Sequence, residues 1–186
     1  METVCREETI ALQRCRDGSK KAFEVVVEKY MKRAYLIALG LVGNRDDALD
    51  LSQEAFFRAY CNIGKLRENA SFFPWFYQIL KNLCFSHLRK VRGRQTCCFD
   101  EQKTDVAASE YWEPGAVAAR NETKALIWKA IGQLDSKHRE VIVLRHFQNL
   151  SYGQIAQVMF CSKGTVMSRL YNARRQMKRI LSGPQE

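Results

Sequence analysis

The 186-residue sequence predicts an all-α protein with two helical domains joined by a flexible acidic linker. Apolar residues recur every three or four positions along most of the chain, and no segment alternates with the period of a strand. Only three prolines occur, which leaves room for long helices. The helical period disappears between residues 96 and 113. We therefore expect domains at 1–95 and 114–183, with 96–113 as the linker.

The charge of the chain is divided into blocks. Residues 1–95 carry 17 Lys and Arg against 11 Asp and Glu, and residues 114–186 carry 12 against 4. The segment 96–113 carries 1 against 5, so an acidic linker separates two basic blocks within a net charge of +10. This pattern is typical of two polyanion-binding modules. A soluble protein with basic, solvated faces would give the same composition, so charge alone does not decide between them.

Three helices are expected in the first domain, at residues 20–42, 46–63 and from about 72 into the basic run 89–94. Gly43 should end the first of them, and Asn44 should cap the second. The first helix should bury one apolar stripe. The stripe consists of Phe23, Val26, Val27, Tyr30, Ala34, Ile37 and Leu41.

Four helices are expected in the second domain, at residues 118–134, 137–147, 151–160 and 162–181. Each carries apolar residues at helical spacing that should face a core. These are Leu126, Ala130, Ile131, Leu134, Val141, Ile142, Leu144, Ile155, Ala156, Met159, Val166, Leu170, Ala173, Met177 and Leu181.

The last two helices predict a helix-turn-helix at about residues 152–171. Ser151 followed by Gln154 fits a capping box, and Ser162 can cap the second helix after a short turn. The outward side of that second helix is rich in hydrogen-bond donors and positive charge, which suits the major groove of DNA. A basic, solvated final helix of a bundle is the alternative. The residues expected to contact DNA are Ser162, Lys163, Gly164, Thr165, Ser168, Arg169, Asn172, Arg175 and Lys178.

The same segment resembles region 4 of the extracytoplasmic-function sigma factors, within the sigma-70 superfamily. The resemblance is carried by residues 140–152, 154–156, 162–166, 168–170 and 173–174. In that family this helix-turn-helix reads the minus-thirty-five element of the promoter, and the resemblance implies the same role here.

Three positions depart from the family's pattern in this region. Phe160 stands in the turn where Gly is common, so it must avoid or tolerate a positive φ. Met167 replaces a usual basic residue, which removes an expected DNA contact. Ser136 replaces a frequent proline at a helix start, where a serine can cap instead.

Residues 20–95 resemble region 2 of the same family, in which the segment matching 44–48 and 50–56 binds RNA polymerase. Asp47, Asp50 and Glu54 form an acidic stripe on a basic domain, which suits a basic protein partner rather than DNA. A solvated helix face is the alternative. Leu49 departs from the family, which more often has an acid there. The residues expected to bind polymerase are Asp47, Asp50, Leu51, Gln53, Glu54, Phe57 and Arg58.

The third helix of the first domain resembles the family's element that recognises and melts minus-ten DNA. The resemblance is carried by Phe72, Trp75, Phe76, Ile79, Asn82 and Arg89. Aromatic side chains stack on unpaired bases, and cations follow the backbone. Trp75, Phe76 and Ile79 are expected in the core rather than on DNA. Gln78 replaces a usual basic residue and Ser86 a usual acidic one, so the resemblance does not determine the base preference. The expected contacts are Asn69, Ser71, Phe73, Tyr77, Lys81, Asn82, His87, Arg89 and Lys90.

The sequence shows no pattern of an enzyme, a cofactor site or a metal site. The three histidines have no ligand spacing, and the seven cysteines form no C-x-x-C pair. Most of the cysteines are expected to be small buried residues in a reducing cytosol. A redox role for Cys97 and Cys98 in the linker is an open alternative.

Together these observations predict a cytoplasmic sigma factor. It would bind core RNA polymerase, direct it to promoter DNA and promote melting at transcription initiation. The resemblance also implies an anti-sigma partner. We found neither a membrane span nor a secretory signal. One alternative is a helix-turn-helix regulator that acts independently of polymerase. Another is a protein–protein adaptor whose basic faces bind acidic partners.

Overall fold

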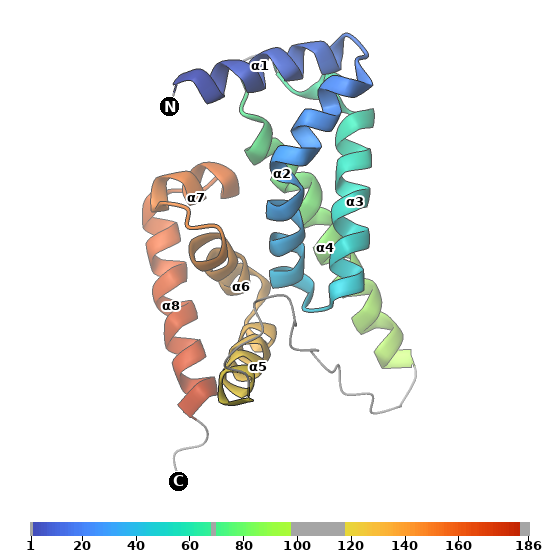
Figure 1. Ribbon diagram of the computed structural model, residues 1–186. Coiled ribbons are helices and arrows are strands. Elements are labelled where there is room, and N and C mark those ends of the chain that lie inside the picture. The colour runs from blue at the N-terminus through green and yellow to red at the C-terminus, as the bar shows by residue number, and fades with distance from the viewer. Residues whose placement is uncertain (1, 68–69, 98–117, 183–186) are drawn as a thin grey trace.

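The computed structural model describes residues 2–67, 70–97 and 118–182, and within them regular structure is helical (Figure 1). This agrees with the predicted all-α class. The elements are α1 (Glu2–Arg16), α2 (Lys20–Val42), α3 (Arg45–Cys61), η1 (Ile63–Lys65), α4 (Phe72–Cys97), α5 (Ala118–Gln133), α6 (Ser136–Ile142), η2 (Val143–Phe147), α7 (Tyr152–Met159) and α8 (Lys163–Ser182).

The elements α1 to α4 form a first bundle, in which α2 packs against α1, α3 and α4. The predicted stripe of α2 lies in the core, although Val27 is only partly buried. The Ser19 hydroxyl accepts a hydrogen bond from the backbone N–H of Ala22 at 3.4 Å and caps the start of the helix. Gly43 ends α2 at φ 80°, and the Asn44 side chain caps α3, both as predicted.

The sequence did not predict α1. The helix lies across the first bundle, and its second half buries Ala11, Leu12 and Cys15 against the other helices (Figure 1). Two of these three side chains are small, so this apolar stripe gives a weak periodic signal. Arg16 ties the end of α1 to the loop after η1, because its Nη2 donates to the Leu66 carbonyl oxygen at 2.9 Å.

The elements α5 to α8 form a second bundle, and three details differ from expectation. Asp135, rather than Ser136, caps α6 through the backbone N–H of His138 at 2.9 Å. The helix predicted for 137–147 changes to π geometry at η2. Leu126 and Leu181, which were expected to face the core, are 56% and 48% exposed.

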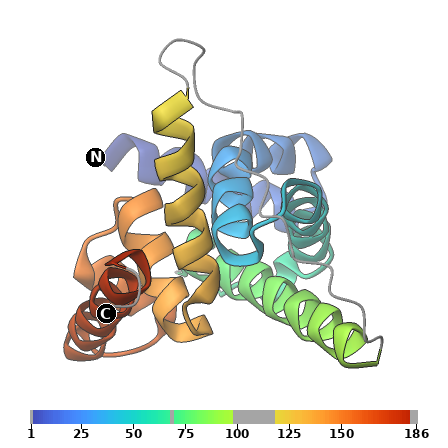
Figure 2. The same cartoon turned by 90° about the horizontal axis from the view of Figure 1, so that it is seen from below.

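The two bundles pack side by side in both views, with the second half of α4 extending away from the second bundle (Figures 1 and 2). Their apolar residues form one continuous core in which α4 contacts α7 and α2 contacts α6 and η2. The expected linker, residues 96–113, lies almost wholly outside the described residues. None of the described helices is long and apolar enough to cross a membrane.

Candidate nucleic-acid interface and protein-docking face

The helix-turn-helix is built from capped helices, as the sequence predicted. The Ser151 hydroxyl accepts from the Gln154 N–H at 3.3 Å, and the Gln154 side chain accepts from the Ser151 N–H at 2.9 Å. This reciprocal pair is a capping box. The Ser162 hydroxyl accepts from the Thr165 N–H at 3.1 Å and caps α8. Both helices therefore begin at fixed residues.

The turn between α7 and α8 takes the left-handed conformation at Phe160, with φ 51° and ψ 50°. The residue is 74% exposed, so packing does not compensate for the strained backbone. The N–H of Cys161 still reaches the Ala156 carbonyl oxygen at 3.0 Å, which closes the end of α7. Phe160 therefore tolerates a conformation that favours glycine.

One side of α8 packs on the bundle and the other faces solvent. Val166, Leu170 and Ala173 are buried. Most of the residues predicted to contact DNA are exposed, whereas Thr165 and Arg169 are half-buried at the edge. We call the exposed side the recognition face. It comprises Lys163, Gly164, Met167, Ser168, Tyr171, Asn172, Arg175 and Lys178.

The recognition face carries positive charge without a compensating acid. The α8 sequence contains no Asp or Glu, and among the described residues none of its cations forms an ion pair. Such a surface attracts the phosphates of DNA. Sequence reasoning missed Tyr171, which is 67% exposed between Ser168 and Arg175. The helical period, which puts Tyr171 one turn after Met167, could have identified it.

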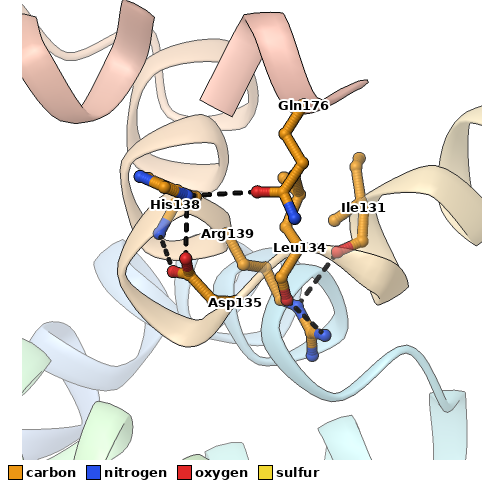
Figure 3. A network of polar contacts seen from close by, with 6 residues as sticks. All are labelled: Ile131, Leu134, Asp135, His138, Arg139 and Gln176. Carbon is orange, nitrogen blue, oxygen red and sulfur yellow. Dashed lines mark hydrogen bonds and ion pairs between the residues drawn. The ribbon is translucent and has the colours of Figure 1, made fainter. Parts of the chain in front are cut away.

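A network around α6 holds α8 in place (Figure 3). The buried Arg139 donates to the carbonyl oxygens of Ile131 at 3.1 Å and Leu134 at 3.2 Å, and also to that of Gly132. These carbonyls end α5, where a helix dipole favours a cation. Beside it, His138 Nδ1 lies 3.2 Å from Gln176 Oε1, which connects α6 to α8. The network thus orients the recognition face relative to α5 and α6.

A second surface lies on α3 and combines acids with exposed apolar side chains. Asp46, Asp50 and Glu54 form one row, and Leu49, Gln53 and Phe57 form the adjacent row at helical spacing. Leu49 is 49% exposed and Phe57 is 64% exposed. We call these two rows the docking face. Acidic and apolar groups side by side suit a protein partner and oppose DNA.

The remaining residues predicted to bind polymerase surround the docking face. Arg58 Nε donates to Glu54 Oε1 at 2.7 Å on the exposed surface. Asp47 is half-buried, and its Oδ2 lies 3.2 Å from Nε2 of His87 on α4. Leu51 is half-buried against the core, so it offers less surface than expected. Sequence reasoning treated Leu49 only as a departure, although its exposure beside Phe57 makes it part of this surface.

The residues predicted to contact minus-ten DNA, on α4 and just before it, differ in exposure. Ser71, Asn82, Arg89 and Lys90 are exposed, Lys81 and His87 are half-buried, and Phe73 and Tyr77 are buried. The Tyr77 hydroxyl donates to Glu140 Oε1 on α6 at 2.8 Å, and Lys81 Nζ lies 3.5 Å from the same oxygen. The second bundle therefore covers the first half of α4, whereas the second half remains open. Asn69 lies outside the described residues.

The aromatic core beneath α4 agrees with expectation. Phe76 is fully buried and stacks on Phe56 with ring centroids 4.5 Å apart. Trp75 and Ile79 are half-buried and pack against the same core. These rings hold α4 at a fixed angle to α3. The docking face therefore lies on one rigid unit with the residues of α4 that were predicted to contact minus-ten DNA, which we call the α4 surface.

The cysteines differ from the expectation that most are buried. Cys15 and Cys84 are buried, Cys61 is exposed and Cys161 is half-buried. Burial raises the pKa of Cys84 to about 12. Cys98 and the Cys97 side chain lie outside the described residues. Within the described part of the chain, no cluster of histidine, cysteine or acidic side chains could hold a metal ion.

Comparison with known proteins decides the family. A sigma-70 region 2 model matches residues 26–94, and a sigma-70 region 4 model matches residues 124–177. The RNA polymerase sigma-H factor of Pseudomonas aeruginosa is 33% identical over 177 residues, which cover 91% of each chain. The chain belongs to the sigma-70 family of RNA polymerase sigma factors.

Other relatives indicate the extracytoplasmic-function type. The ECF RNA polymerase sigma-E factor of Escherichia coli K12 is 29% identical over 89% of each chain. Among solved structures, CnrH in complex with the cytosolic domain of CnrY has a TM-score of 0.71 at 20% identity, covering 96% of this chain and 99% of that one. The sigma factor RpoE of Bartonella quintana, in complex with the anti-sigma factor NepR, has a TM-score of 0.66 at 24% identity, covering 89% and 99%. These structures share the fold.

The match to both regions excludes the alternatives of an independent regulator and an adaptor. It establishes a sigma factor for transcription initiation, in which the first bundle holds region 2 and the second bundle holds region 4.

Proposed function

We propose that three surfaces of this sigma factor each bind a different partner. The docking face binds core RNA polymerase, the α4 surface binds and melts the minus-ten element, and the recognition face binds the minus-thirty-five element. The observation that carries this proposal is the segregation of charge. The acidic residues of the docking face are on region 2, whereas every charged residue of the recognition face on region 4 is a cation.

On the recognition face, the start of α8 suits the major groove. An α-helix fits this groove, and the residues of its first turns reach base edges. We assign base contacts to Ser168 and Asn172, and phosphate contacts to Lys163, Arg175 and Lys178. The backbone N–H groups at the start of α8 add to the favourable field for phosphate. Ser162, Gly164, Thr165 and Arg169 complete the set at the edge of the face.

On α4, aromatic and cationic residues suit a single strand. Stacking of an unpaired base on an aromatic ring contributes about 1–3 kcal/mol, and extrusion of a base costs a few kcal/mol. We assign backbone contacts to Lys81, Arg89 and Lys90. Phe73 and Tyr77, the rings expected to stack on bases, are buried in this arrangement, so stacking on them requires the first half of α4 to be uncovered. Asn69, Ser71, Asn82 and His87 complete the proposed pocket.

A reconstituted transcription assay tests whether the docking face and the recognition face act in separate steps. Core polymerase with this chain should start at promoters that core polymerase alone does not use. Asp50→Ala with Glu54→Ala should lower affinity for core polymerase and leave DNA binding by region 4 unchanged. Arg169→Ala with Arg175→Ala should do the reverse. Equal impairment of the same step by both pairs would refute the division.

The remaining parts of the proposal concern partners and location. We propose that the acidic linker, residues 96–113, passes near the nucleic-acid channels of polymerase, and that the chain acts in the cytoplasm with its polymerase. Because the linker joins two weak DNA-binding modules, binding of one module raises the effective concentration of the other near its own DNA element. We also propose an anti-sigma partner, which the complex of RpoE with the anti-sigma factor NepR supports. A purified partner should block transcription by the reconstituted holoenzyme, and unchanged transcription would refute it.

A further inference from the structure

A cavity of about 550 Å³ lies between α2 of region 2 and the segment that joins η2 to α7 in region 4. Its volume is typical of a small-molecule site. None of the described residues that line it is acidic. Cations line its α2 side and amide side chains line its region 4 side. These are Lys29, Lys32 and Arg33 on α2, and Gln148, Asn149 and Gln154 on region 4.

The positive charge of the cavity is only partly compensated. The three cations are three and four positions apart, so they share one side of α2. Lys29 Nζ pairs with Glu8 Oε2 at 2.5 Å. Lys32 and Arg33 form no ion pair with any described residue. Arg33 is half-buried, and burial lowers its pKa. Two cations of the cavity therefore lack an anion.

Hydrogen-bond donors in the cavity also lack acceptors. Arg33 Nε donates to Gln148 Oε1 at 3.1 Å, which connects the two walls. Gln148 Nε2 is buried and has no hydrogen-bond partner among the described residues. A buried donor without an acceptor is unfavourable, so an acceptor that reached Nε2 after a small rotation of the side chain would remove this cost. The guanidinium of Arg33 adds terminal N–H groups beside it.

The region 4 wall is held in place by its own contacts. Asn149 takes the left-handed conformation at φ 51°, which asparagine tolerates better than most residues. The Leu150 N–H donates to the Leu144 carbonyl oxygen at 3.2 Å, and Arg145 Nη1 donates to the Leu150 carbonyl oxygen at 2.8 Å. A wall that is already ordered loses less conformational entropy when a ligand binds, which favours binding.

We propose that this cavity binds the diphosphate group of a small molecule, either free pyrophosphate or the diphosphate of a nucleotide. Each of the two uncompensated cations can take one phosphate, and a guanidinium matches phosphate oxygens with two parallel hydrogen bonds. The amide of Gln148 donates to a further oxygen. Leu36 and Phe147 add an apolar part to the lining, against which a nucleoside can pack.

The ligand would contact both regions at once. Lys32 and Arg33 belong to region 2 and Gln148 belongs to region 4, so the complete site exists only while the regions pack together. A ligand that binds the folded chain and not the unfolded chain stabilises it by an amount set by its concentration and its Kd. This inference does not depend on the DNA contacts proposed above.

The test measures binding of inorganic pyrophosphate and of ADP to the full chain, in magnesium-free buffer at constant ionic strength. Either probe should bind at one site by isothermal titration calorimetry. At about thirty times its Kd, it should raise the melting temperature by at least about 3 °C. Adenosine, which lacks phosphate, should do neither. Tighter binding of ADP would identify a nucleotide as the source of the group, and equal binding would identify the diphosphate alone.

Three variants connect binding to this cavity. Lys32→Gln should weaken binding at least about fivefold, because a charged hydrogen bond is lost. Lys21→Gln is the matched control, since it removes an exposed lysine of the same helix outside the cavity, and it should change the affinity less than about twofold. Gln148→Glu keeps an acceptor for Arg33, so the chain should stay folded, but its negative charge should weaken binding at least about tenfold.

Three results would overturn the inference. The first is the absence of saturable binding by both probes. The second is an equal loss of affinity in Lys32→Gln and Lys21→Gln, which would mean that overall charge attracts the anion. The third is a single-stranded 20-nucleotide DNA whose binding depends on Lys32 while pyrophosphate and ADP do not bind, which would assign the cavity to a nucleic-acid backbone.

Discussion

The two helices proposed to contact DNA, α4 and α8, differ in how accessible their contact residues are. The recognition face of α8 is exposed along its length, and Tyr171 is 67% exposed. The first half of α4 lies under region 4, and Tyr77 is fully buried there. In both helices the sequence pattern predicts one apolar side, and the other residues are polar and often basic. Exposure of a predicted contact therefore depends on domain docking as much as on the helix itself.

The difference follows from the kind of contact that each helix is proposed to make. Phosphate and base-edge contacts use charged and polar groups, which stay in water until DNA arrives. Stacking on unpaired bases uses aromatic rings, which also pack well against another domain. A surface built to bind flipped bases is thus a surface that a neighbouring domain can cover.

The largest expected effect concerns Arg139, which holds region 4 together and reaches region 2. Arg139→Met should lower the free energy of unfolding by about 3 kcal/mol, because buried carbonyl oxygens at the end of α5 and at Leu41 lose their donor. Urea unfolding followed by circular dichroism measures this. Arg58→Met, which breaks an exposed pair with Glu54, should cost no more than about 1 kcal/mol. Equal losses would contradict the structural role of Arg139.

A smaller effect is expected at α8, the helix whose contact residues are exposed. Arg175→Ala should weaken duplex binding by about 1 kcal/mol and reduce the salt dependence by about 0.9 in slope, since one phosphate contact is lost. Fluorescence anisotropy across a salt series gives both values. Lys137→Ala removes an exposed cation of α6 outside the recognition face and should change neither. A loss at Lys137 as large as that at Arg175 would mean that overall charge, rather than the face, binds DNA.

The turn before α8 gives an effect of the opposite sign. Phe160→Gly should raise the free energy of unfolding by about 0.5–1 kcal/mol, because glycine relieves the left-handed strain and little buried surface is lost. Phe57→Gly, at an exposed position within α3, should instead lower it by a similar amount. Thermal unfolding of both variants compares them. A destabilised Phe160→Gly chain would show that the ring contributes packing.

The smallest effect is a pH dependence at His146 of region 4. Burial, followed by the charges of Arg174 and Arg145, lowers the pKa of His146 below its ordinary value of 6.5. The folded chain thus favours the neutral ring. This contribution to stability is present above pH 6.5 and is lost as the pH falls toward the lowered pKa. His146→Asn should reduce the drop in melting temperature between pH 7 and pH 5.5. If the melting temperature of the His146→Asn chain drops as much as that of the original chain, His146 is not the source of the drop.

Much of each helix was predictable from the sequence, because local patterns decide it. The α2 stripe and the caps at Asn44, Ser151 and Ser162 agree with the structure. The cap at Asp135 was assigned to the neighbouring Ser136, since either side chain can accept the hydrogen bond.

What could not be predicted depends on contacts between distant segments. The partner of Tyr77 is Glu140, 63 positions away, and no periodic signal marks such a pair. The exposure of Leu49 was missed for the same reason, because only the assembled bundle determines which faces are covered. The α1 helix was missed for a local reason, since the small Ala11 and Cys15 give its apolar stripe a weak periodic signal. Sequence patterns identify the faces of a helix, whereas packing selects the face that remains in water.

The left-handed turn at Phe160 also has a genetic consequence. Neither phenylalanine codon becomes a glycine codon by a single base change, because the first two bases both differ. The two single-base intermediates encode valine and cysteine, and a β-branched valine fits a positive φ poorly. A lineage selected for stability should therefore reach glycine at residue 160 through cysteine, or keep the phenylalanine.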